Sequence, residues 1–352
     1  MSASPQLTQK LKTLLTIWII SILAGIIFQY FDDGFVDHNA FFMGTLIGLG
    51  FGLYELYFIS KVKRKIKSYA LPIIILINVF LYTLLVFIIS AVGGLVGGAL
   101  SNKSLSEYYD YLTGVEQFYL IGYSIIVFTF IILFLQINRL LGKGVLIKLL
   151  LARYRKPVEE ERIIMFLDLT SSSEIAERLN PQDYSSFIKD FFLDLDDAII
   201  ETKGYVFQYV GDEVVILWDP KEGAENNNCT KLFFYAKDKI LEKKDYYTNK
   251  YGIIPQFKAG IHYGKVVVSE IGGTKQEIAY HGDTINTAAR IRSTCHTLNS
   301  ELLISAELLS LLHNIDVEFD VNSVGISNFK GKKNVIGLFS ISENNNSTSK
   351  IL

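Results

Sequence analysis

The sequence has few cysteines, little net charge and none of several common catalytic motifs. Only Cys229 and Cys295 occur among 352 residues, so no disulfide framework is indicated and a reducing compartment fits. The GxxxxGK(S/T), GxSxG and HExxH motifs are absent, which excludes the nucleotide-binding and hydrolase signatures that they define. The five histidines do not have the spacing of metal ligands. The formal net charge is −2, and we expect no nucleic-acid partner.

Four long apolar runs are present in the first part of the chain, and 50% of all residues are hydrophobic. The runs begin at Leu14, Ala40, Leu71 and Phe118. Each is near or above the roughly 18 to 20 apolar residues that a helix needs to cross a bilayer. We therefore predict an α-helical membrane domain of four spans over residues 1–138. The alternative is a signal peptide followed by a buried helical core, which three further runs of this length disfavour.

Basic residues next to these runs predict the orientation of the protein. The segment KVKRKIK at residues 61–67 follows the second run, and six Lys or Arg residues lie within residues 139–156. Because basic loops stay on the cytoplasmic side, we expect a multi-pass protein of the cell membrane with both termini and the C-terminal domain in the cytoplasm. The outer loops are too short to form a ligand-binding domain, so an input would come through the spans, lipid or another membrane protein.

Residues 139–157 are predicted to form an amphipathic helix that couples the two halves of the chain. Apolar residues share one face of this helix, basic residues lie elsewhere, and Pro157 is expected to end it. The apolar residues are Leu140, Leu141, Val145, Leu146, Leu149 and Leu150. Such a helix could lie on anionic lipid or pair with its copy in a dimer. Either arrangement keeps the following domain near the membrane.

Residues 158–342 are predicted to form one soluble domain, followed by a flexible polar tail at residues 343–352. Strand and helix patterns alternate without a steady βαβ rhythm, which favours an α+β fold with helices on one face of the sheet. The segment GYVFQYVGDEVVILW, which ends at Trp218, contains two runs of alternating apolar residues. It predicts a hairpin whose turn lies at Gly211 and Asp212.

Two acidic residues at the ends of predicted strands are candidate metal ligands. Asp212 lies in the hairpin turn, where an Asp after Gly is also ordinary turn chemistry. Asp168 ends a very apolar strand and precedes hydroxyl residues that can cap the next helix; a helix N-cap is the structural alternative for it. If the two acids converge, a hard divalent cation such as Mg²⁺ would compensate their charge. The free amides at the helix start would suit phosphates.

Five segments, in order and spacing, resemble the catalytic domain of class III nucleotidyl cyclases of the membrane-anchored bacterial type. They are FLDLTSSSEIAE, YVGDEVVIL, AGIHYGKVV, HGDTINTAARI and FKGKKNV. The resemblance covers residues 158–342 and implies a ferredoxin-like antiparallel sheet with helices. It also implies the conversion of ATP to 3′,5′-cyclic AMP and pyrophosphate. Asp168 and Asp212 match the family's metal-binding aspartates, which hold two Mg²⁺ or Mn²⁺ ions on the triphosphate.

The same resemblance assigns further residues to the substrate. Asn286 and Arg290 match the ribose-orienting and transition-state residues, and their spacing places them on one helix face. Lys330 matches a lysine that contacts the terminal phosphates. The hydroxyl residues expected near the phosphates are Thr170, Ser171 and Ser172. The structural alternatives are a helix with an exposed arginine and a basic surface turn.

In the family, the metals and the Asn/Arg pair that act on one nucleotide come from opposite subunits. This chain carries both sets of residues, so the resemblance implies a head-to-tail homodimer with two equivalent sites. Small rotations relayed from the bilayer through residues 139–157 could then open or close both sites.

Base selection departs from the family pattern. Adenylate-forming members typically have Lys at the position of Gln208 and Asp or Thr near Ala279, whereas guanylate-forming members tend to have Glu and Cys. The Gln208 amide can donate or accept a hydrogen bond, and a small shift of register would bring Glu277 or Tyr280 into the place of Ala279. We expect ATP as the substrate, with GTP as the alternative. A catalytically silent nucleotide-binding signalling module, and a small transporter or sensor with an accessory domain, are the other classes considered.

Overall fold

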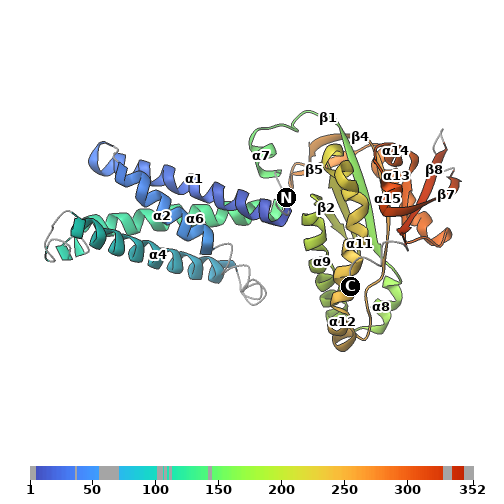
Figure 1. Cartoon of the computed structure of the whole chain (residues 1–352), viewed down its shortest axis with the longest axis horizontal. Helices are drawn as coiled ribbons and strands as arrows, with labels where there is room; N and C mark the ends of the chain where they lie inside the picture. Colours follow the sequence, from blue (N-terminus) through green and yellow to red (C-terminus); the bar gives the residue numbers. More distant parts are fainter. Residues whose placement is uncertain are drawn as a thin grey trace. The chain divides into compact units, whose positions relative to one another are not determined.

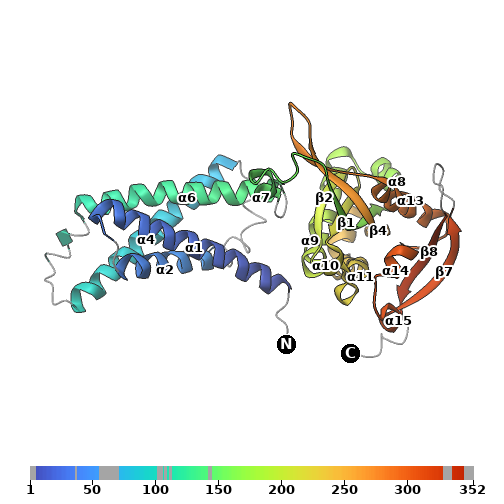
Figure 2. The same cartoon turned by 90° about the horizontal axis from the view of Figure 1, so that it is seen from above.

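The computed structural model divides into two compact units, Met1–Leu140 and Leu141–Leu352, each with its own hydrophobic core. Figures 1 and 2 show the chain in two views, with labels on many of its helices and strands. The structure describes residues 5–35, 38–54, 71–100, 106, 109–110, 113–141, 145–327 and 335–344.

Long apolar helices make up the described part of the N-terminal unit. They are α1 (Pro5–Asp33), α2 (His38–Leu53), α4 (Leu71–Leu100) and α6 (Val115–Leu141). Three of them, α1, α4 and α6, contain a stretch long and apolar enough to cross a membrane. The apolar part of α2, Phe41–Leu53, is shorter, and the rest of the second predicted span falls outside the described residues, as does the basic segment 61–67. The fourth span stays a prediction.

Aromatic rings form the centre of the N-terminal unit. The buried ring of Phe51 lies with its centroid 4.1 Å from that of Tyr82 and 5.2 Å from that of Phe128, which joins α2, α4 and α6. α1 and α2 approach closely at Gly44, where a Cβ would lie 2.9 Å from the Cα of Ile22. Large apolar side chains on the outer surfaces are exposed, as lipid-facing positions would be. They include Leu15, Leu23, Leu76, Phe80, Ile126 and Phe130.

The helix predicted over residues 139–157 is shorter than expected. α6 ends at Leu141, residues 142–144 lie outside the described part of the chain, and α7 covers only Val145–Leu150. The prediction that Pro157 ends the helix is therefore wrong.

A left-handed turn explains this early ending of α7. Ala152 has φ 53°, and its amide donates to the carbonyl of Leu149 at 2.9 Å, while the amide of Arg153 donates to the carbonyl of Lys148 at 3.0 Å. These two bonds form a Schellman motif, which satisfies the last carbonyls of a helix and redirects the chain. The redirected chain then places Tyr154 in the core of the C-terminal unit, where 2% of it is exposed.

The C-terminal unit is built on a sheet that contains eight strands in the described residues. The strand order is β2-β3-β1-β4-β6-β8-β7, with β5 paired to β4. The strands are β1 (Val158–Leu169), β2 (Tyr205–Val210), β3 (Glu213–Trp218), β4 (Phe257–Ile271), β5 (Glu277–His281), β6 (Leu302–Ser305), β7 (Phe319–Ser327) and β8 (Ile336–Glu343). The sheet is mixed, because β4 and β6 pair in parallel while the other pairs are antiparallel. β4 and β5 form a hairpin arm that extends from the sheet (Figure 2).

Helices cover both faces of this sheet, so the prediction of helices on one face is wrong. The helices are α8 (Ser172–Arg178), α9 (Pro181–Glu201), α10 (Pro220–Ala224), α11 (Asn228–Glu242), α12 (Lys244–Tyr251), α13 (Asp283–Thr297), α14 (Ala306–Leu309) and α15 (Ile315–Glu318), with a short 3₁₀ turn at Glu225–Asn227. α9 and α11 pack on one face of β1 and β3, and α13 packs on the other. A central strand between two helical layers is buried on both sides, which explains the very apolar sequence of β1.

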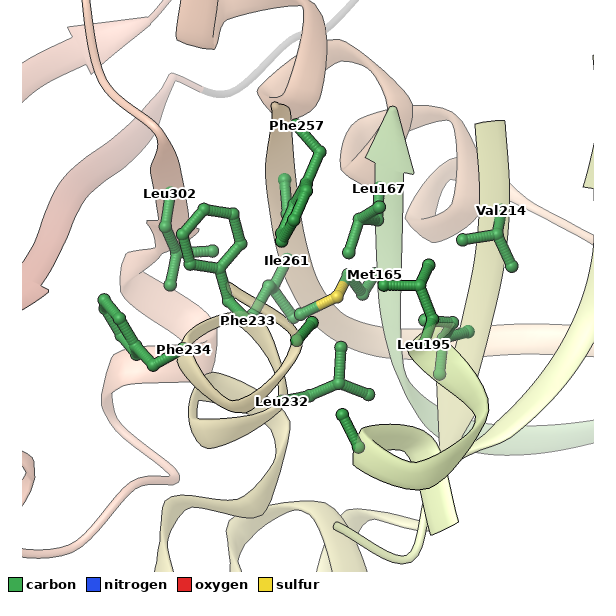
Figure 3. Close-up of a cluster of buried hydrophobic side chains, with 14 of the residues drawn as sticks. Met165, Leu167, Leu195, Val214, Leu232, Phe233, Phe234, Phe257, Ile261 and Leu302 are labelled. Atoms are coloured by element: carbon green, nitrogen blue, oxygen red, sulfur yellow. The ribbon is translucent and has the colours of Figure 1, made fainter. Parts of the chain in front are cut away.

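The alternation of side chains along β1 sorts residues between the two layers. Met165 and Leu167 face α9 and α11 in the main core, together with Phe257 and Phe233 (Figure 3). The intervening even-numbered residue, Phe166, faces the α13 side. Because successive side chains of a strand point to opposite faces, the next even position, Asp168, lies on the α13 face at the end of the strand.

Candidate active site

The ends of β1 and the β2–β3 hairpin bring Asp168 and Asp212 together. Gly211 and Asp212 form the hairpin turn as predicted, and Gly211 has φ 63°, a conformation that favours glycine. Asp168 is the register partner of Glu213, and the amide of Leu169 donates to the carbonyl of Asp212 at 3.4 Å. The Asp168 and Asp212 side chains lie within hydrogen-bonding reach of each other. Two acids that are 44 positions apart in the chain therefore share one site.

Burial and neighbouring carboxylates disfavour the ionised acids of this site, so a nearby positive charge would stabilise them. The pKa of Asp168 is raised to about 6, mainly by burial, with contributions from Asp212 and Glu213, while the nearby Arg292 acts in the opposite direction. Burial likewise raises the pKa of Glu213, against the effect of Arg292. Carboxyl groups resist ionisation where like charges gather away from water.

Arg292 of α13 is the cation that the structure places among these acids, and the sequence motifs did not single it out. Its Nη1 lies 3.1 Å from Oδ2 of Asp168, and its Nη2 lies 2.5 Å from Oε2 of Glu213. The guanidinium therefore bridges the ends of β1 and β3. Position 292 carries no recognisable signal in the sequence alone, because an arginine on a helix is most often an exposed surface residue.

The two aspartates fit a divalent cation when part of its coordination comes from elsewhere. Hard cations take oxygen ligands and usually keep waters or substrate phosphates in their shell. Among the described residues, no group of three or more His, Cys, Asp or Glu side chains is arranged to hold a metal by itself. Asp168 and Asp212 supply a pair of adjacent carboxylates, which leaves the remaining coordination positions for phosphate and water oxygens.

Asn286 and Arg290 lie on α13, but on a different flank of the helix from Arg292. The buried side of α13 is formed by Thr284, Thr287, Ala288, Ile291 and Cys295. Asn286 is exposed and Arg290 is partly exposed. Residues two positions apart on an α-helix differ by about 200°, so Arg290 and Arg292 leave opposite flanks of α13. The flank that reaches Asp168 in the same chain is therefore not the flank of Asn286 and Arg290.

The predicted hydroxyl residues surround the start of α8. Ser171 is the N-cap residue, but its φ is 55° and its side chain makes no capping hydrogen bond, so the expected side-chain cap is absent. The amide of Thr170 donates to the carbonyl of Gln256 at 2.7 Å. Ser172 is hydrogen-bonded to the Tyr184 hydroxyl. Thr170 and Ser171 line a surface cavity of about 320 Å³.

The base-selecting candidates lie on β2 and on the β4–β5 arm. Gln208 is exposed and follows a β-bulge. Tyr280 faces β2, since its ring centroid lies 4.8 Å from that of Phe207, and the adjacent Ala279 lies on the opposite face of β5. Tyr280 therefore shares a face of the sheet with β2 side chains, whereas Ala279 does not. Lys330 lies outside the described residues.

Comparison with known proteins gives the family of the C-terminal unit. The model of the adenylate and guanylate cyclase catalytic domain matches residues 155–342, so the chain belongs to this family. Adenylate cyclase 2 of Rhizobium meliloti (strain 1021) is 38% identical over 182 residues, which cover 52% of this chain and 50% of that protein. An adenylate cyclase of Anabaena cylindrica is 26% identical over 184 residues, 51% of this chain and 36% of that protein. The chain thus spans half or less of the length of these relatives.

Solved structures of cyclases also resemble the C-terminal unit. The crystal structure of the guanylyl cyclase Cya2 is 19% identical, has a TM-score of 0.47, and the match covers 53% of this chain and 93% of that chain.

Proposed function

We propose that this protein is a membrane-anchored adenylate cyclase that converts ATP to 3′,5′-cyclic AMP and pyrophosphate at sites shared by two copies of the chain. The observation that carries this proposal is the meeting of Asp168 and Asp212 at the α13 face of the sheet. The family of residues 155–342 and the 38% identical adenylate cyclase support it.

Each proposed site residue has a distinct task. Asp168 and Asp212 would hold two Mg²⁺ or Mn²⁺ ions, which when bound activate the ribose 3′-hydroxyl and neutralise the triphosphate. Asn286 would orient the ribose, and the guanidinium of Arg290 would meet the charge that develops on the α-phosphate. Thr170, Ser171 and Ser172 border the phosphate end, and Lys330 would contact the terminal phosphates. The 3′-oxygen would form a bond to the α-phosphorus as the bond from that phosphorus to the bridging oxygen of pyrophosphate breaks. The hydroxyl proton would pass to solvent or to the released pyrophosphate, and no water is consumed.

The homodimer follows from the two flanks of α13. Asn286 and Arg290 leave α13 on the side away from the Asp168 of their own chain, so an Asp pair in one subunit would meet the Asn/Arg pair of the other. A head-to-tail pair of chains would form two equivalent sites. Relay from the membrane through α7 and Tyr154 would act on both sites.

ATP is the proposed substrate, and GTP is the second candidate. Gln208 can present a donor or an acceptor to either base, and the Tyr280 hydroxyl, which lies 3.5 Å from that of Tyr205, can also do both. Groups that can either donate or accept a hydrogen bond discriminate only weakly between adenine and guanine. We therefore expect measurable turnover of GTP at a lower rate than that of ATP.

The anchor is proposed to cross the membrane four times, with the C-terminal unit in the cytoplasm. Protease treatment of sealed vesicles tests this orientation. Inside-out vesicles should lose the C-terminal unit and right-side-out vesicles should keep it; the reverse pattern would contradict the orientation.

One assay tests the proposed function. The full chain, purified in lipid nanodiscs, is incubated with Mn²⁺ and either ATP or GTP, and the products are separated by chromatography. We expect cyclic AMP from ATP. A folded dimer that forms no cyclic nucleotide from either substrate would leave the silent signalling module as the better explanation.

A further inference from the structure

Arg292 occupies the side of the Asp168 carboxylate that faces α13. Its two terminal nitrogens contact different strands, one at Asp168 of β1 and one at Glu213 of β3. The Arg292 side chain is 28% exposed and that of Glu213 is 13% exposed, so water screens this contact only in part. A fork that bridges two carboxylates fixes the direction of both.

Gly260 allows the backbone of α13 at Arg292 to lie close against β4. A Cβ on Gly260 of β4 would lie 2.2 Å from the amide nitrogen of Arg292 and 2.6 Å from its Cα. Only glycine therefore allows α13 to lie this close to the sheet. Gly260 is the register partner of Phe166, two residues before Asp168, and this contact sets Arg292 beside the end of β1.

The positive charge of Arg292 next to Asp168 would affect the binding of a metal ion by Asp168. The carboxylates of Asp168 and Glu213 contact the guanidinium of Arg292, and Asp212 lies close to both acids. Lys258, the register partner of Asp168 on β4, lies on the same face of the sheet. A divalent cation bound by Asp168 would face the positive charge of Arg292 across the same carboxylate.

We propose that Arg292 is a positioning residue that holds the Asp168 carboxylate in place and competes with the divalent cation for it. Arg292 thereby lowers the affinity of the site for metal and keeps the carboxylates of Asp168 and Glu213 together until metal and nucleotide bind. This inference rests on the proposed function, because it takes Asp168 and Asp212 as the metal-binding pair.

The test measures Mn²⁺ binding to the nucleotide-free full chain in nanodiscs, using the electron paramagnetic resonance signal of free Mn²⁺. Replacing Arg292→Gln should lower the Kd for Mn²⁺ by about tenfold, since one positive charge beside the ion is removed. It should also lower the Tm of the metal-free protein, and saturating Mn²⁺ should raise Tm more in this variant than in the wild type. An unchanged or higher Kd would overturn the proposal, because a purely structural ion pair predicts that result.

Two further variants make the result specific. Arg155→Gln removes one exposed positive charge at the other end of β1, roughly 35 Å of strand away, and should leave the Kd for Mn²⁺ within about twofold. If Arg292→Gln does not fold, Arg292→Lys keeps the charge but loses the two nitrogens that bridge Asp168 and Glu213. This variant should still lower the Kd, by about two- to threefold, and a Kd equal to or above the wild-type value would again overturn the proposal.

The Asp212→Ala variant separates failure of this inference from failure of the proposed function. If the wild type binds Mn²⁺ and Asp212→Ala does not, the metal site stands, and the Arg292 variants decide the inference alone. If Asp212→Ala binds Mn²⁺ as the wild type does, the metal site and the inference both fall.

Discussion

At the scale of single residues, the candidate site depends on carboxylates that gain from a cation and are costly without one. Asp168 and Asp212 lie side by side, and burial together with Asp212 raises the pKa of Asp168 to about 6. Removal of Asp212 should therefore lower the rate of catalysis without lowering the stability of the fold. The positive charge of Arg292 compensates the carboxylates of Asp168 and Glu213, which it contacts.

Replacing Asp212→Ala should reduce turnover by at least about a hundredfold, because a proposed metal ligand is lost. The same change should leave the Tm unchanged or slightly higher, because the repulsion with Asp168 disappears. Both quantities can be measured on the full chain, with the exposed Asp245→Ala as the matched control. Wild-type turnover in Asp212→Ala would reduce Asp212 to a turn residue.

The pKa of another acid, Asp190, is shifted in the opposite direction to that of Asp168. Burial raises its pKa, but hydrogen bonds from Tyr246, Tyr251 and Lys250 at 2.6, 2.6 and 2.9 Å outweigh burial, and the net pKa is lowered from 3.8. A carboxyl with a lowered folded-state pKa stabilises the protein above its unfolded value, and this stability is lost as the pH falls through the folded value.

Asp190→Asn should therefore lower stability at pH 7 by about 1 to 2 kcal/mol. The difference from the wild type should shrink once the pH falls below 3.8. Thermal unfolding from pH 3 to pH 7 checks this, with Asp245→Asn as the control. A difference that does not depend on pH would show that the Asp190 charge plays no part.

The two aspartates of the candidate site were easier to predict from the sequence than the residues that surround them. Asp168 and Asp212 could be named in advance because Asp168 ends one apolar strand and Asp212 follows another, but their pairing rested on the resemblance to the cyclase family. Arg292 could not, because its role depends on the close approach of α13 to Gly260, which no local pattern encodes. The side-chain cap expected at Ser171 fails for a similar reason, since the backbone there has a positive φ that points the hydroxyl elsewhere.

At the scale of elements, the hairpin at Gly211 and Asp212 was predictable and the ending of α7 was not. Strands β2 and β3 alternate with period 2 and meet at a turn that Gly favours. α7 ends at an Ala–Arg sequence without Gly or Asn, and the turn at Ala152 forms because the following residue that enters the core is Tyr154. Helices on both faces of the sheet were missed because α13 has only a narrow apolar stripe.

Tyr154 is the link between α7 and the sheet. Its hydroxyl donates to Oε1 of Glu160 at 3.0 Å, and its ring packs in the cluster that contains Ala288 of α13. The carbonyl of Tyr154 accepts from the amide of Glu270 at 2.8 Å. The segment after α7 thus shares one hydrophobic cluster with the helix of Asn286 and Arg290.

Tyr154→Ala should destabilise the C-terminal unit by about 3 to 5 kcal/mol, as expected for loss of a buried aromatic ring. Tyr154→Phe should cost only about 1 kcal/mol, because one hydrogen bond is lost. The fluorescence of the buried Trp218 reports this unfolding in a Trp18→Phe background. The partly exposed Tyr235→Ala serves as the control, and equal effects of Tyr154→Ala and Tyr235→Ala would rule out the anchoring role.

At the scale of the whole molecule, the chain contains an apolar helical unit and a unit of the cyclase family. Three helices of the first unit are long and apolar enough to cross a membrane. Residues 155–342 match the cyclase catalytic domain. Length and hydropathy predict the three long apolar helices of the first unit, and the fourth span stays a prediction. The homodimer of the second unit rests on the resemblance to the cyclase family.

The central claim, that two chains share each site, is tested most directly by mixing two inactive variants. In a dimer of Asp212→Ala with Arg290→Ala, one site carries both lesions and the other carries neither. Each variant alone should be inactive, and co-expressed full-length chains that pair at random should recover about a quarter of wild-type cyclic AMP formation. If the mixture is as inactive as its components, or if either variant is active by itself, the shared site is contradicted.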